Sequence, residues 1–446
     1  PLVTNEVAWG GTAASSTGQW IELHNTTGQN VSLSNWTLMT DTLYIPLSGS
    51  IPAHGYYLIE KDNDTVVSDV SADLISTFPN TGGGFGIGGG ALTLAFRSDE
   101  GTTTVDRVAV CSFWCGGTSN ANGAKTMERY DANALGTGVT NWGTALGEFF
   151  LNGHDANNSA IKGTPKAKNS ISYLVANGGV LSSNKTLTQA NSPYLIDRSG
   201  LAVSSGATLT LRSGTVIKIV SPNNPSFIVH GTLTSEGTEL EPVVITAFAD
   251  DEYGGDMNGD GVCNSGNASS TASCPYPGSW IRLLFNATSA GSTLTRTIIR
   301  YGGVLSSNTY PPAMVIADGA NLTVNASTFA YARKHGLYLS GGSSTVSNSL
   351  FDRNASSTDA VGLFVEGGGS SVSGNTFSNN AYGLEIWSAP NAQTFNNTFT
   401  ANSSGAALLV GDFGNFHDNS GTGNTPNAFA LAGGVTTSAS IGTTTF

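Results

Sequence analysis

Charged residues are scarce in this chain, since only 11% of its 446 residues are Asp, Glu, Lys or Arg. The 31 acidic residues outnumber the 18 basic ones, which gives a net charge of −13. A surface of this sign repels phosphate groups and anionic lipids. Nucleic acid and anionic membranes are therefore excluded as expected partners.

Long hydrophobic runs are also missing. We find no apolar segment long enough to span a bilayer and no basic stretch leading into one. The first residue is Pro1 rather than Met, which predicts an exported protein whose signal has been removed; an excised fragment would look the same. The expected location is extracellular or on the cell surface.

Cysteine is rare, but its four positions are informative. Cys111 lies close to Cys115, and Cys263 lies close to Cys274. Neither pair has the CxxC spacing, and no histidine lies near enough in sequence to complete a zinc site. Two local pairs predict two disulfides, which form in oxidising compartments.

Asparagine, serine and threonine are abundant, and they create several acceptor sequences for N-linked glycans. A chain of this composition also produces such sequences by chance. The possible glycosylation sites are Asn25, Asn30, Asn35, Asn63, Asn184, Asn286, Asn321, Asn325 and Asn354.

Residues 1–165 contain short strand-like segments such as "QWIELHN" and "VSLSNWTL", each bounded by Gly, Asn, Ser or Pro. This spacing is typical of an all-β sandwich. Six blocks, "NEVAWGGT", "QWIELHN", "LSNWTL", "IPAHGYYLIEKD", "TMERYD" and "NWGTA", occur in an order that resembles a bacterial lamin-tail-like domain. The resemblance implies an immunoglobulin-like β-sandwich that serves attachment or interaction. Residues 166–170 are the predicted linker.

The remaining residues, 171–446, have a repeating pattern. Apolar triplets follow a small residue at Gly336, Gly362, Gly383, Ala407 and Ala428. A second track consists of Phe329, Phe351, Phe377 and Phe399, which are 22, 26 and 22 residues apart. Such a period indicates a solenoid, and triplets that alternate between inside and outside indicate β-strands.

Stacked coils place the repeated apolar side chains in columns through one core, which predicts a parallel β-helix. Upstream, "SGATLTLRSGTVIKI" and "FIVHGTLTSEGTELEPVVITAF" resemble the first coils of right-handed parallel β-helix proteins of the pectin-lyase-like superfamily.

An acidic insertion at about 250–276 carries the strongest site signal. Asp256, Asn258 and Asp260 occupy alternate positions, Gly261 follows, and the carbonyl of Val262 comes next. This spacing lets oxygen ligands converge on calcium, and Asp250 and Asp251 are the expected further ligands. Position 12 is Asn267 rather than Glu, so an EF-hand is excluded. A solvated turn without metal is the alternative. The expected role of calcium is structural.

A catalytic constellation is harder to find. No Lys or Arg follows Arg353, and the acids beyond it occur singly in sequence. The basic cluster Arg333, Lys334 and His335 lies near Asp352 and is expected to form an exposed, salt-bridged corner. Tyr382 and Trp387 are candidates for stacking on neutral sugars, with packing as the alternative. The sequence predicts no catalytic residue and no enzyme activity.

The predicted protein is therefore a secreted, non-catalytic structural protein, stabilised by calcium and disulfides. Its last segment, "VTTSASIGTTTF", is strand-like and uncharged. Exposed strand edges pair readily with other chains, and a contact that does not close produces a filament or lattice. The expected partner is another copy of the chain. The alternatives are a glycan-binding adhesin and a β-helix polysaccharide lyase or hydrolase.

Overall fold

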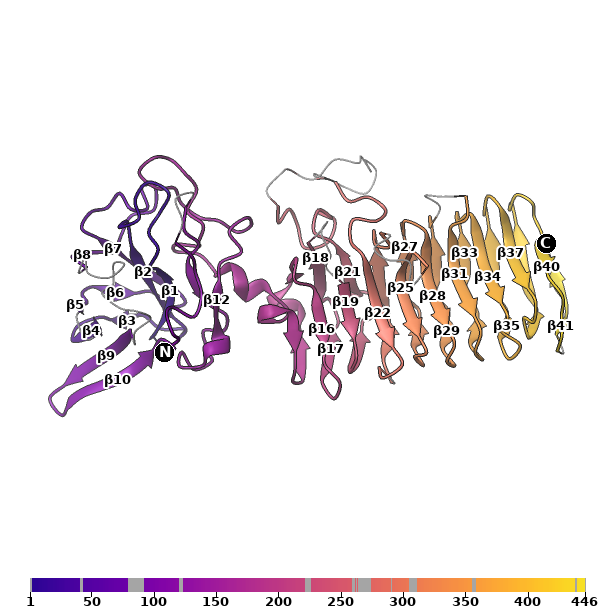
Figure 1. Ribbon diagram of the computed structural model, residues 1–446, viewed down its shortest axis with the longest axis horizontal. Coiled ribbons are helices and arrows are strands. Elements are labelled where there is room, and N and C mark those ends of the chain that lie inside the picture. Colours follow the sequence, from indigo (N-terminus) through magenta and orange to yellow (C-terminus); the bar gives the residue numbers. More distant parts are fainter. Residues whose placement is uncertain are drawn as a thin grey trace. The chain divides into compact units, whose positions relative to one another are not determined.

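The structure is a computed structural model that describes residues 2–40, 43–78, 92–119, 123–220, 226–258, 261, 263, 274–289, 291–304, 311–354, 358–437 and 439–445. The chain divides into two compact units, Pro1–Asn177 and Gly178–Phe446. Both units consist of β-strands and short 3-10 helices in the described residues (Figure 1). The predicted all-β fold class is confirmed.

The first unit contains two larger sheets and one short strand pair. The six-stranded sheet has the order β12 (Trp142–Thr144), β11 (Met127–Arg129), β1 (Leu2–Ala8), β2 (Trp20–Asn25), β7 (Tyr56–Lys61) and β8 (Leu74–Ser76). The four-stranded sheet has the order β10 (Gly101–Arg107), β9 (Thr93–Ser98), β4 (Trp36–Met39) and β5 (Tyr44–Pro46). The pair consists of β3 (Val31–Ser32) and β6 (Ser50–Ile51), and the 3-10 helices are η1 (Val139–Asn141) and η2 (Ser170–Tyr173).

Apolar side chains of both larger sheets form the core of this unit. Ile21 and Leu23 on β2 lie in one buried cluster with Leu38 on β4 and Leu94 on β9. Alternate residues of a strand point to opposite faces, so each sheet contributes every second side chain to the core. The arrangement is β-sandwich-like, as the short alternating segments predict.

The boundary between the units lies later than the predicted linker at residues 166–170. Those residues belong to the first unit, because buried carboxylates of the six-stranded sheet hold them. Glu22 accepts a hydrogen bond from the backbone N–H of Lys166. Glu128 accepts one from the backbone N–H of Ile171 at 2.9 Å. The start of the solenoid therefore moves from residue 171 to Gly178.

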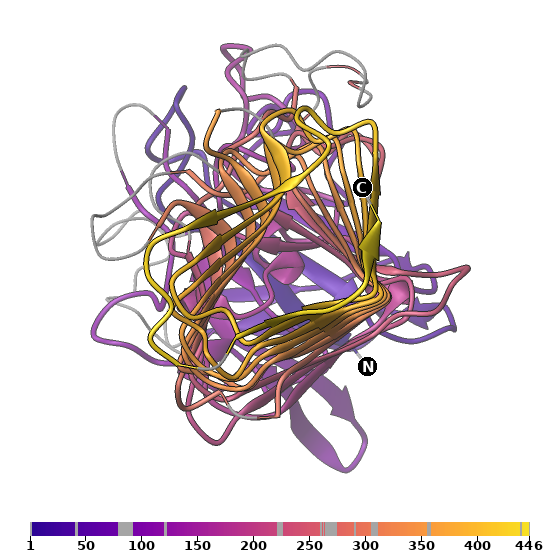
Figure 2. The same cartoon turned by 90° about the vertical axis from the view of Figure 1, so that its right-hand side faces the viewer.

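The second unit is a parallel solenoid of three ten-stranded sheets, which Figure 2 shows enclosing a common interior. The first sheet contains β13 (Val180–Leu181), β16 (Leu201–Val203), β19 (Ser226–Val229), β22 (Arg282–Asn286), β25 (Ala313–Asp318), β28 (His335–Ser340), β31 (Val361–Glu366), β34 (Tyr382–Trp387), β37 (Gly405–Val410) and β40 (Phe429–Ala432).

The second sheet contains β14 (Lys185–Leu187), β17 (Thr208–Arg212), β20 (Thr232–Glu236), β23 (Thr293–Thr295), β26 (Thr323–Asn325), β29 (Thr345–Ser347), β32 (Ser371–Ser373), β35 (Gln393–Phe395), β38 (Asn415–His417) and β41 (Ser440–Ile441). The third contains β15 (Tyr194–Ile196), β18 (Val216–Ile219), β21 (Val243–Ala247), β24 (Thr297–Arg300), β27 (Thr328–Ala330), β30 (Leu350–Asp352), β33 (Thr376–Ser378), β36 (Thr398–Thr400), β39 (Asn419–Thr422) and β42 (Thr444–Thr445). Near its start lie η3 (Asn177–Gly179) and η4 (Gln189–Asn191).

The predicted phenylalanine column is confirmed. Phe329, Phe351, Phe377 and Phe399 pair in register through the third sheet, and each is completely buried. Successive ring centroids are 4.9, 5.0 and 4.9 Å apart. This spacing matches the distance between neighbouring strands, so the rings stack along the solenoid.

Two ladders of buried asparagines run beside the rings, and they were not among the features predicted from the sequence. One ladder consists of Asn354, Asn380, Asn402 and Asn424, and the other of Asn375, Asn397 and Asn419. In each step, the side-chain N–H group donates to the Oδ1 of the asparagine one coil further on. The separations of 26 and 22 residues are those of the phenylalanine track, so the signal was present in the sequence.

One predicted triplet is displaced by a residue. Ala407 pairs with Leu384 rather than with Gly383, so Ala406 is the small residue that begins this repeat. Ala406 and Ala407 are both small and both buried, and composition alone does not choose between them. A shift of one residue exchanges the two faces of a strand. Leu409 therefore faces the core, and Leu408 lies on the outer face.

Candidate functional site

The acidic insertion leaves the solenoid after β21 and returns before β22. Its first acid, Asp250, is completely buried and forms a double hydrogen bond with Arg300, at 2.7 Å to Nε and 2.6 Å to Nη2. The same guanidinium group contacts Glu252 at 2.6 Å and lies over the ring of Tyr253. Burial lowers the pKa of Arg300, but the hydrogen bonds to Asp250 and Glu252 outweigh it and hold the pKa above its ordinary value. Arg300 therefore offsets part of the negative charge for which calcium was expected from the sequence.

The other predicted calcium ligands lie partly outside the described residues. Asp260 and Val262 are not described. Asp251 accepts a hydrogen bond from the backbone N–H of Cys263 at 2.6 Å, and Asp256 accepts one from the N–H of Gly261 at 3.0 Å. The described part of the chain contains no group of three or more His, Cys, Asp or Glu residues arranged to hold a metal. The calcium site stays a prediction, and Asn258 remains one of its expected ligands.

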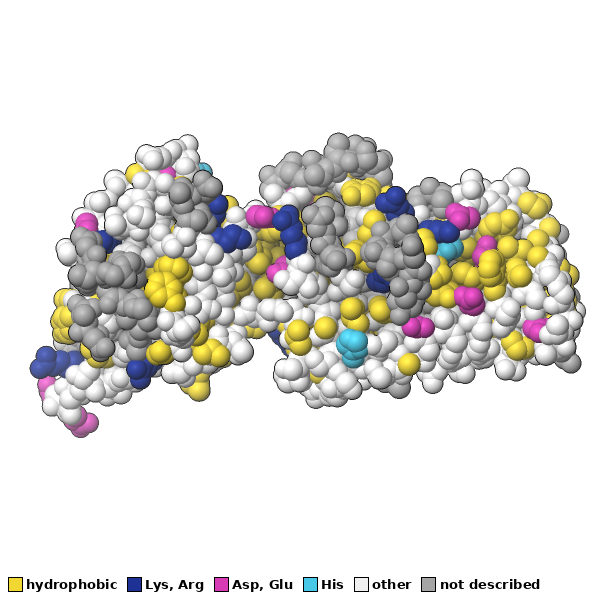
Figure 3. Space-filling view, viewed as in Figure 1, with side chains coloured by type: hydrophobic (Ala, Val, Ile, Leu, Met, Phe, Trp, Pro, Cys, Tyr) yellow, Lys and Arg dark blue, Asp and Glu magenta, His cyan; other side chains and the backbone are white. Residues whose placement is uncertain are grey.

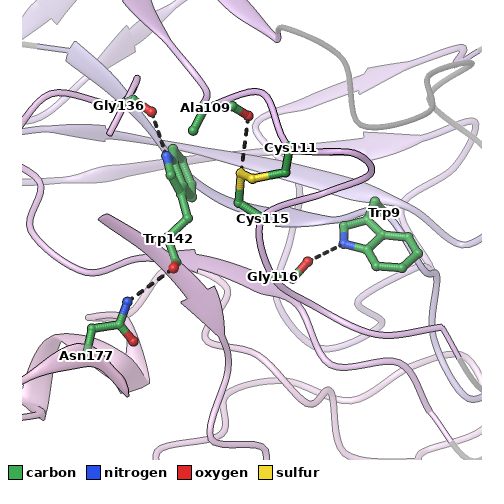
Figure 4. Close-up of a disulfide and its surroundings, with 8 residues drawn as sticks. All are labelled: Trp9, Ala109, Cys111, Cys115, Gly116, Gly136, Trp142 and Asn177. Atoms are coloured by element: carbon green, nitrogen blue, oxygen red, sulfur yellow. Dashed lines mark hydrogen bonds between the residues drawn. A yellow bond between two sulfur atoms is a disulfide. The ribbon is translucent and has the colours of Figure 1, made fainter. Parts of the chain in front are cut away.

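Both predicted disulfides are present. Cys263 is bonded to Cys274 across the acidic insertion. Cys111 is bonded to Cys115 in the first unit (Figure 4). Nearby, the indole N–H of Trp9 donates to the carbonyl of Gly116 at 2.8 Å. Both bonds close short loops and are compatible with an oxidising compartment.

The predicted glycosylation sites differ in how far their asparagine side chains are exposed to solvent. Asn25 and Asn354 are completely buried. The side-chain N–H group of Asn25 donates to three backbone carbonyls, including that of Gln29 at 2.7 Å. In the folded chain, therefore, these two nitrogens are not available for a sugar. Glycosylation stays a prediction at the exposed or partly exposed positions, which are Asn30, Asn35, Asn63, Asn184, Asn286, Asn321 and Asn325.

The outer face of the first solenoid sheet carries an unexpected cluster. On β31, Leu363 and Val365 are fully buried in the core, so Phe364 between them points to the opposite face. Strand register places Ile316 and Tyr338 before Phe364, and Glu385 and Leu408 after it. We call the "outer-face cluster" the set Ile316, Tyr338, Phe364, Tyr382, Glu385, Trp387 and Leu408, together with His335.

Aromatic rings make up most of the outer-face cluster. The ring of Phe364 lies 5.1 Å from that of Tyr338, 5.3 Å from that of Trp387 and 5.5 Å from that of His335. Trp387 is 40% exposed, and Tyr382 is partly exposed. Figure 3 shows hydrophobic side chains gathered over this part of the solenoid, with acidic side chains among them.

Two titratable groups are buried within this cluster. Glu385 is 7% exposed and His335 is 4% exposed. Burial, assisted by the negative charge of Asp359 and opposed by Lys334, raises the pKa of Glu385 to about 7. Burial, together with the positive charge of Lys334, lowers the pKa of His335 to about 3. Near neutral pH, His335 is therefore uncharged, and Glu385 is present in both its protonated and its ionised form.

The predicted salt-bridged corner is present in part. Lys334 pairs with Asp359 at 2.6 Å, and Arg353 pairs with Asp352. His335 departs from the prediction, because it is buried against Phe364 instead of exposed. The Nδ1 of His335 has no hydrogen-bond partner in the described part of the chain.

The cluster was missed because its acids occur singly in sequence. Glu385 lies two coils after His335, and only the strand register places both residues beside Phe364. The available signal was the middle position of each apolar triplet, where Tyr338, Phe364 and Glu385 stand. The predicted stacking candidates, Tyr382 and Trp387, do lie in the outer-face cluster.

Comparison with known proteins agrees with the second unit. A family model described as the right handed beta helix region matches residues 286–445. With the three parallel sheets, this match identifies the solenoid as a right-handed parallel β-helix of about ten turns. No curated protein and no solved structure matches the chain. The resemblance of the first unit to lamin-tail-like domains stays a prediction.

The fold is consistent with an extracellular or surface protein. In the ranges that the structure describes, no helix is long and apolar enough to cross a membrane. The two disulfides agree with an extracellular location.

Proposed function

We propose that this protein is an extracellular, non-catalytic scaffold whose solenoid binds glycans through the outer-face cluster. The observation that carries the proposal is the 40% exposure of Trp387 beside the ring of Phe364. A large aromatic surface that is left partly open to solvent can stack on the apolar face of a sugar ring. Of the functions considered from the sequence, the adhesin therefore has the most support.

The charge of the surroundings favours an uncharged glycan. Glu366 is exposed beside the cluster and accepts a hydrogen bond from the hydroxyl of Tyr338. Asp318 lies on the same outer face, two strands away on β25. These carboxylates repel polyuronates, whereas their oxygens can accept hydrogen bonds from sugar hydroxyls.

The interior supports the scaffold part of the proposal. Stacked rings and asparagine ladders connect successive coils, so that the side chains of the outer face are held on a rigid surface. Rigid presentation reduces the ordering cost of binding. Calcium in the acidic insertion is proposed as a further stabiliser, and the lamin-tail-like unit is proposed as an attachment module.

Binding of neutral polysaccharides, measured by affinity electrophoresis, tests the proposed function. We expect Trp387→Ala to weaken binding roughly tenfold, which corresponds to about 1.4 kcal/mol. Leu240→Ala is the matched control, because Leu240 is 92% exposed in the same solenoid but lies outside the cluster. Equal binding by both variants and the unaltered protein would contradict the site. Turnover of a polysaccharide would contradict the non-catalytic role.

Head-to-tail assembly is a second candidate. In the described residues, β40, β41 and β42 are the last strands of the three sheets. Leu431 and Ile441 in this coil are 59% and 41% exposed, and burying them would favour association. Sedimentation velocity over a range of concentrations tests the candidate, since a single monomeric species throughout would oppose it.

A further inference from the structure

We propose that Glu385 is a proton-dependent hydrogen-bond donor in the outer-face cluster, so that the cluster binds uncharged glycans when this carboxyl is protonated and releases them when it ionises. This inference rests on the proposed glycan binding and specifies how that binding is regulated.

The position of Glu385 in the sheet is the first support. Register places its side chain between Phe364 on β31 and Leu408 on β37. Both neighbours are apolar, and Glu385 itself is 7% exposed. A carboxylate in such surroundings loses hydration, which favours the uncharged acid. The uncharged acid is therefore the favoured form over a wider pH range than for an exposed glutamate.

The charged groups around Glu385 do not remove this preference. From the segment before β28, Lys334 faces it, but the ammonium group of Lys334 is paired with Asp359 at 2.6 Å. On β31, the carboxylate of Glu366 is bonded to the hydroxyl of Tyr338. On β25, Asp318 adds a further negative charge to the same face.

The buried imidazole of His335 provides the second support. His335 is 4% exposed, its Nδ1 has no hydrogen-bond partner among the described residues, and its ring lies against Phe364. Its pKa of about 3, lowered chiefly by burial, keeps it neutral at the pH values where Glu385 titrates. His335 is thus an uncharged neighbour whose protonation state does not change, and the change in charge falls on Glu385.

The consequence for a ligand follows from hydrogen-bond chemistry. A protonated carboxyl donates one hydrogen bond and accepts others, whereas a carboxylate only accepts. A sugar that covers Trp387 and Glu385 would also remove the remaining water from the carboxylate, at a cost in binding free energy. Ionisation therefore removes a donor and adds a desolvation penalty at the same time.

The experiment uses the full chain and a panel of neutral polysaccharides: dextran, a β-1,3-glucan and a galactomannan. Affinity is measured at about pH 5.5 and about pH 8.5. With a pKa of about 7, only a few per cent of Glu385 remains protonated at the higher pH, so we expect roughly tenfold weaker binding there. Glu385→Gln keeps a neutral donor and is expected to bind equally at both pH values.

The outcomes separate this inference from the proposed function. Binding by the unaltered protein that does not change with pH, but is weakened by Trp387→Ala, overturns the role of Glu385 and leaves the glycan site standing. A pH dependence that persists in Glu385→Gln also overturns that role. Absence of binding to every polysaccharide at both pH values overturns the proposed function and the inference with it. Circular dichroism at both pH values verifies that each variant is folded.

Discussion

Replacement of a single asparagine in the buried ladder of Asn375, Asn397 and Asn419 should strongly destabilise the solenoid, although only one small side chain is removed. Asn397 is 1% exposed. Its Nδ2 donates to the carbonyl of Val372 at 2.9 Å and to the Oδ1 of Asn419 at 3.0 Å. Its Oδ1 accepts from the backbone N–H and from the Nδ2 of Asn375, at 2.9 and 3.0 Å. Asn397→Ala removes all of these contacts without replacing any of them.

The expected magnitude follows from the groups left behind. The two donors of Asn375 and the carbonyl of Val372 each lose a partner in a buried environment, and an unsatisfied buried group costs about 1–3 kcal/mol. We therefore expect Asn397→Ala to lower the free energy of opening of the surrounding coils by roughly 3–5 kcal/mol. Asn391→Ala is the control, since Asn391 is exposed in the neighbouring turn and its replacement should change stability by about 0.5 kcal/mol or less.

Hydrogen exchange followed by mass spectrometry is the suitable assay, because it reports each unit separately. Amides in residues 372–424 should exchange at least roughly a hundredfold faster in Asn397→Ala, while those in residues 2–61 should not change. If the two variants differed by less than about 1 kcal/mol in residues 372–424, the ladder would not be the stabilising network that its hydrogen bonds imply.

Three further predictions concern other parts of the chain. Phe377→Ala, in the middle of the buried ring column, should destabilise the solenoid by about 3–5 kcal/mol, measured by urea unfolding; a loss below about 1 kcal/mol would refute the stacked core. The first unit should lose stability as pH rises from about 4.5 to about 8, because burial and the neighbouring Glu128 raise the pKa of Glu6 to about 8 and the folded state favours its protonated form. Thermal unfolding at several pH values measures this loss, and Glu6→Gln should reduce the slope. Removal of calcium with a chelator should make the acidic insertion more sensitive to proteolysis, and Asp256→Asn should abolish that response; digestion that is identical with and without chelator would argue against the metal.

Much of the architecture was already evident in the sequence. The phenylalanine spacing of one coil determined the stacked column, because a solenoid repeats the same environment once per turn. The disulfides were also predictable, because the two cysteines of each pair lie close together in the sequence. The asparagine ladders were predictable as well, since Asn380 and Asn402 are 22 residues apart in step with Phe377 and Phe399.

Other features depended on contacts between distant residues. Arg300 forms an ion pair with Asp250, which lies 50 residues away in the sequence. The negative charge of the acidic insertion is therefore better compensated in the fold than the sequence indicated. The segment after residue 165 looked like a linker because the carboxyl groups that hold it, those of Glu22 and Glu128, are remote in sequence.

The outer-face cluster shows most clearly which features the sequence determines and which depend on the tertiary structure. The sequence by itself determined that the apolar triplets form strands, and it identified Tyr382 and Trp387 as candidates for stacking on sugars. Only the tertiary structure decided which side chains meet, because a change of one residue in register exchanges the inner and outer faces. Register placed Glu385 between Phe364 and Leu408, and burial raises the pKa of its carboxyl group to about 7.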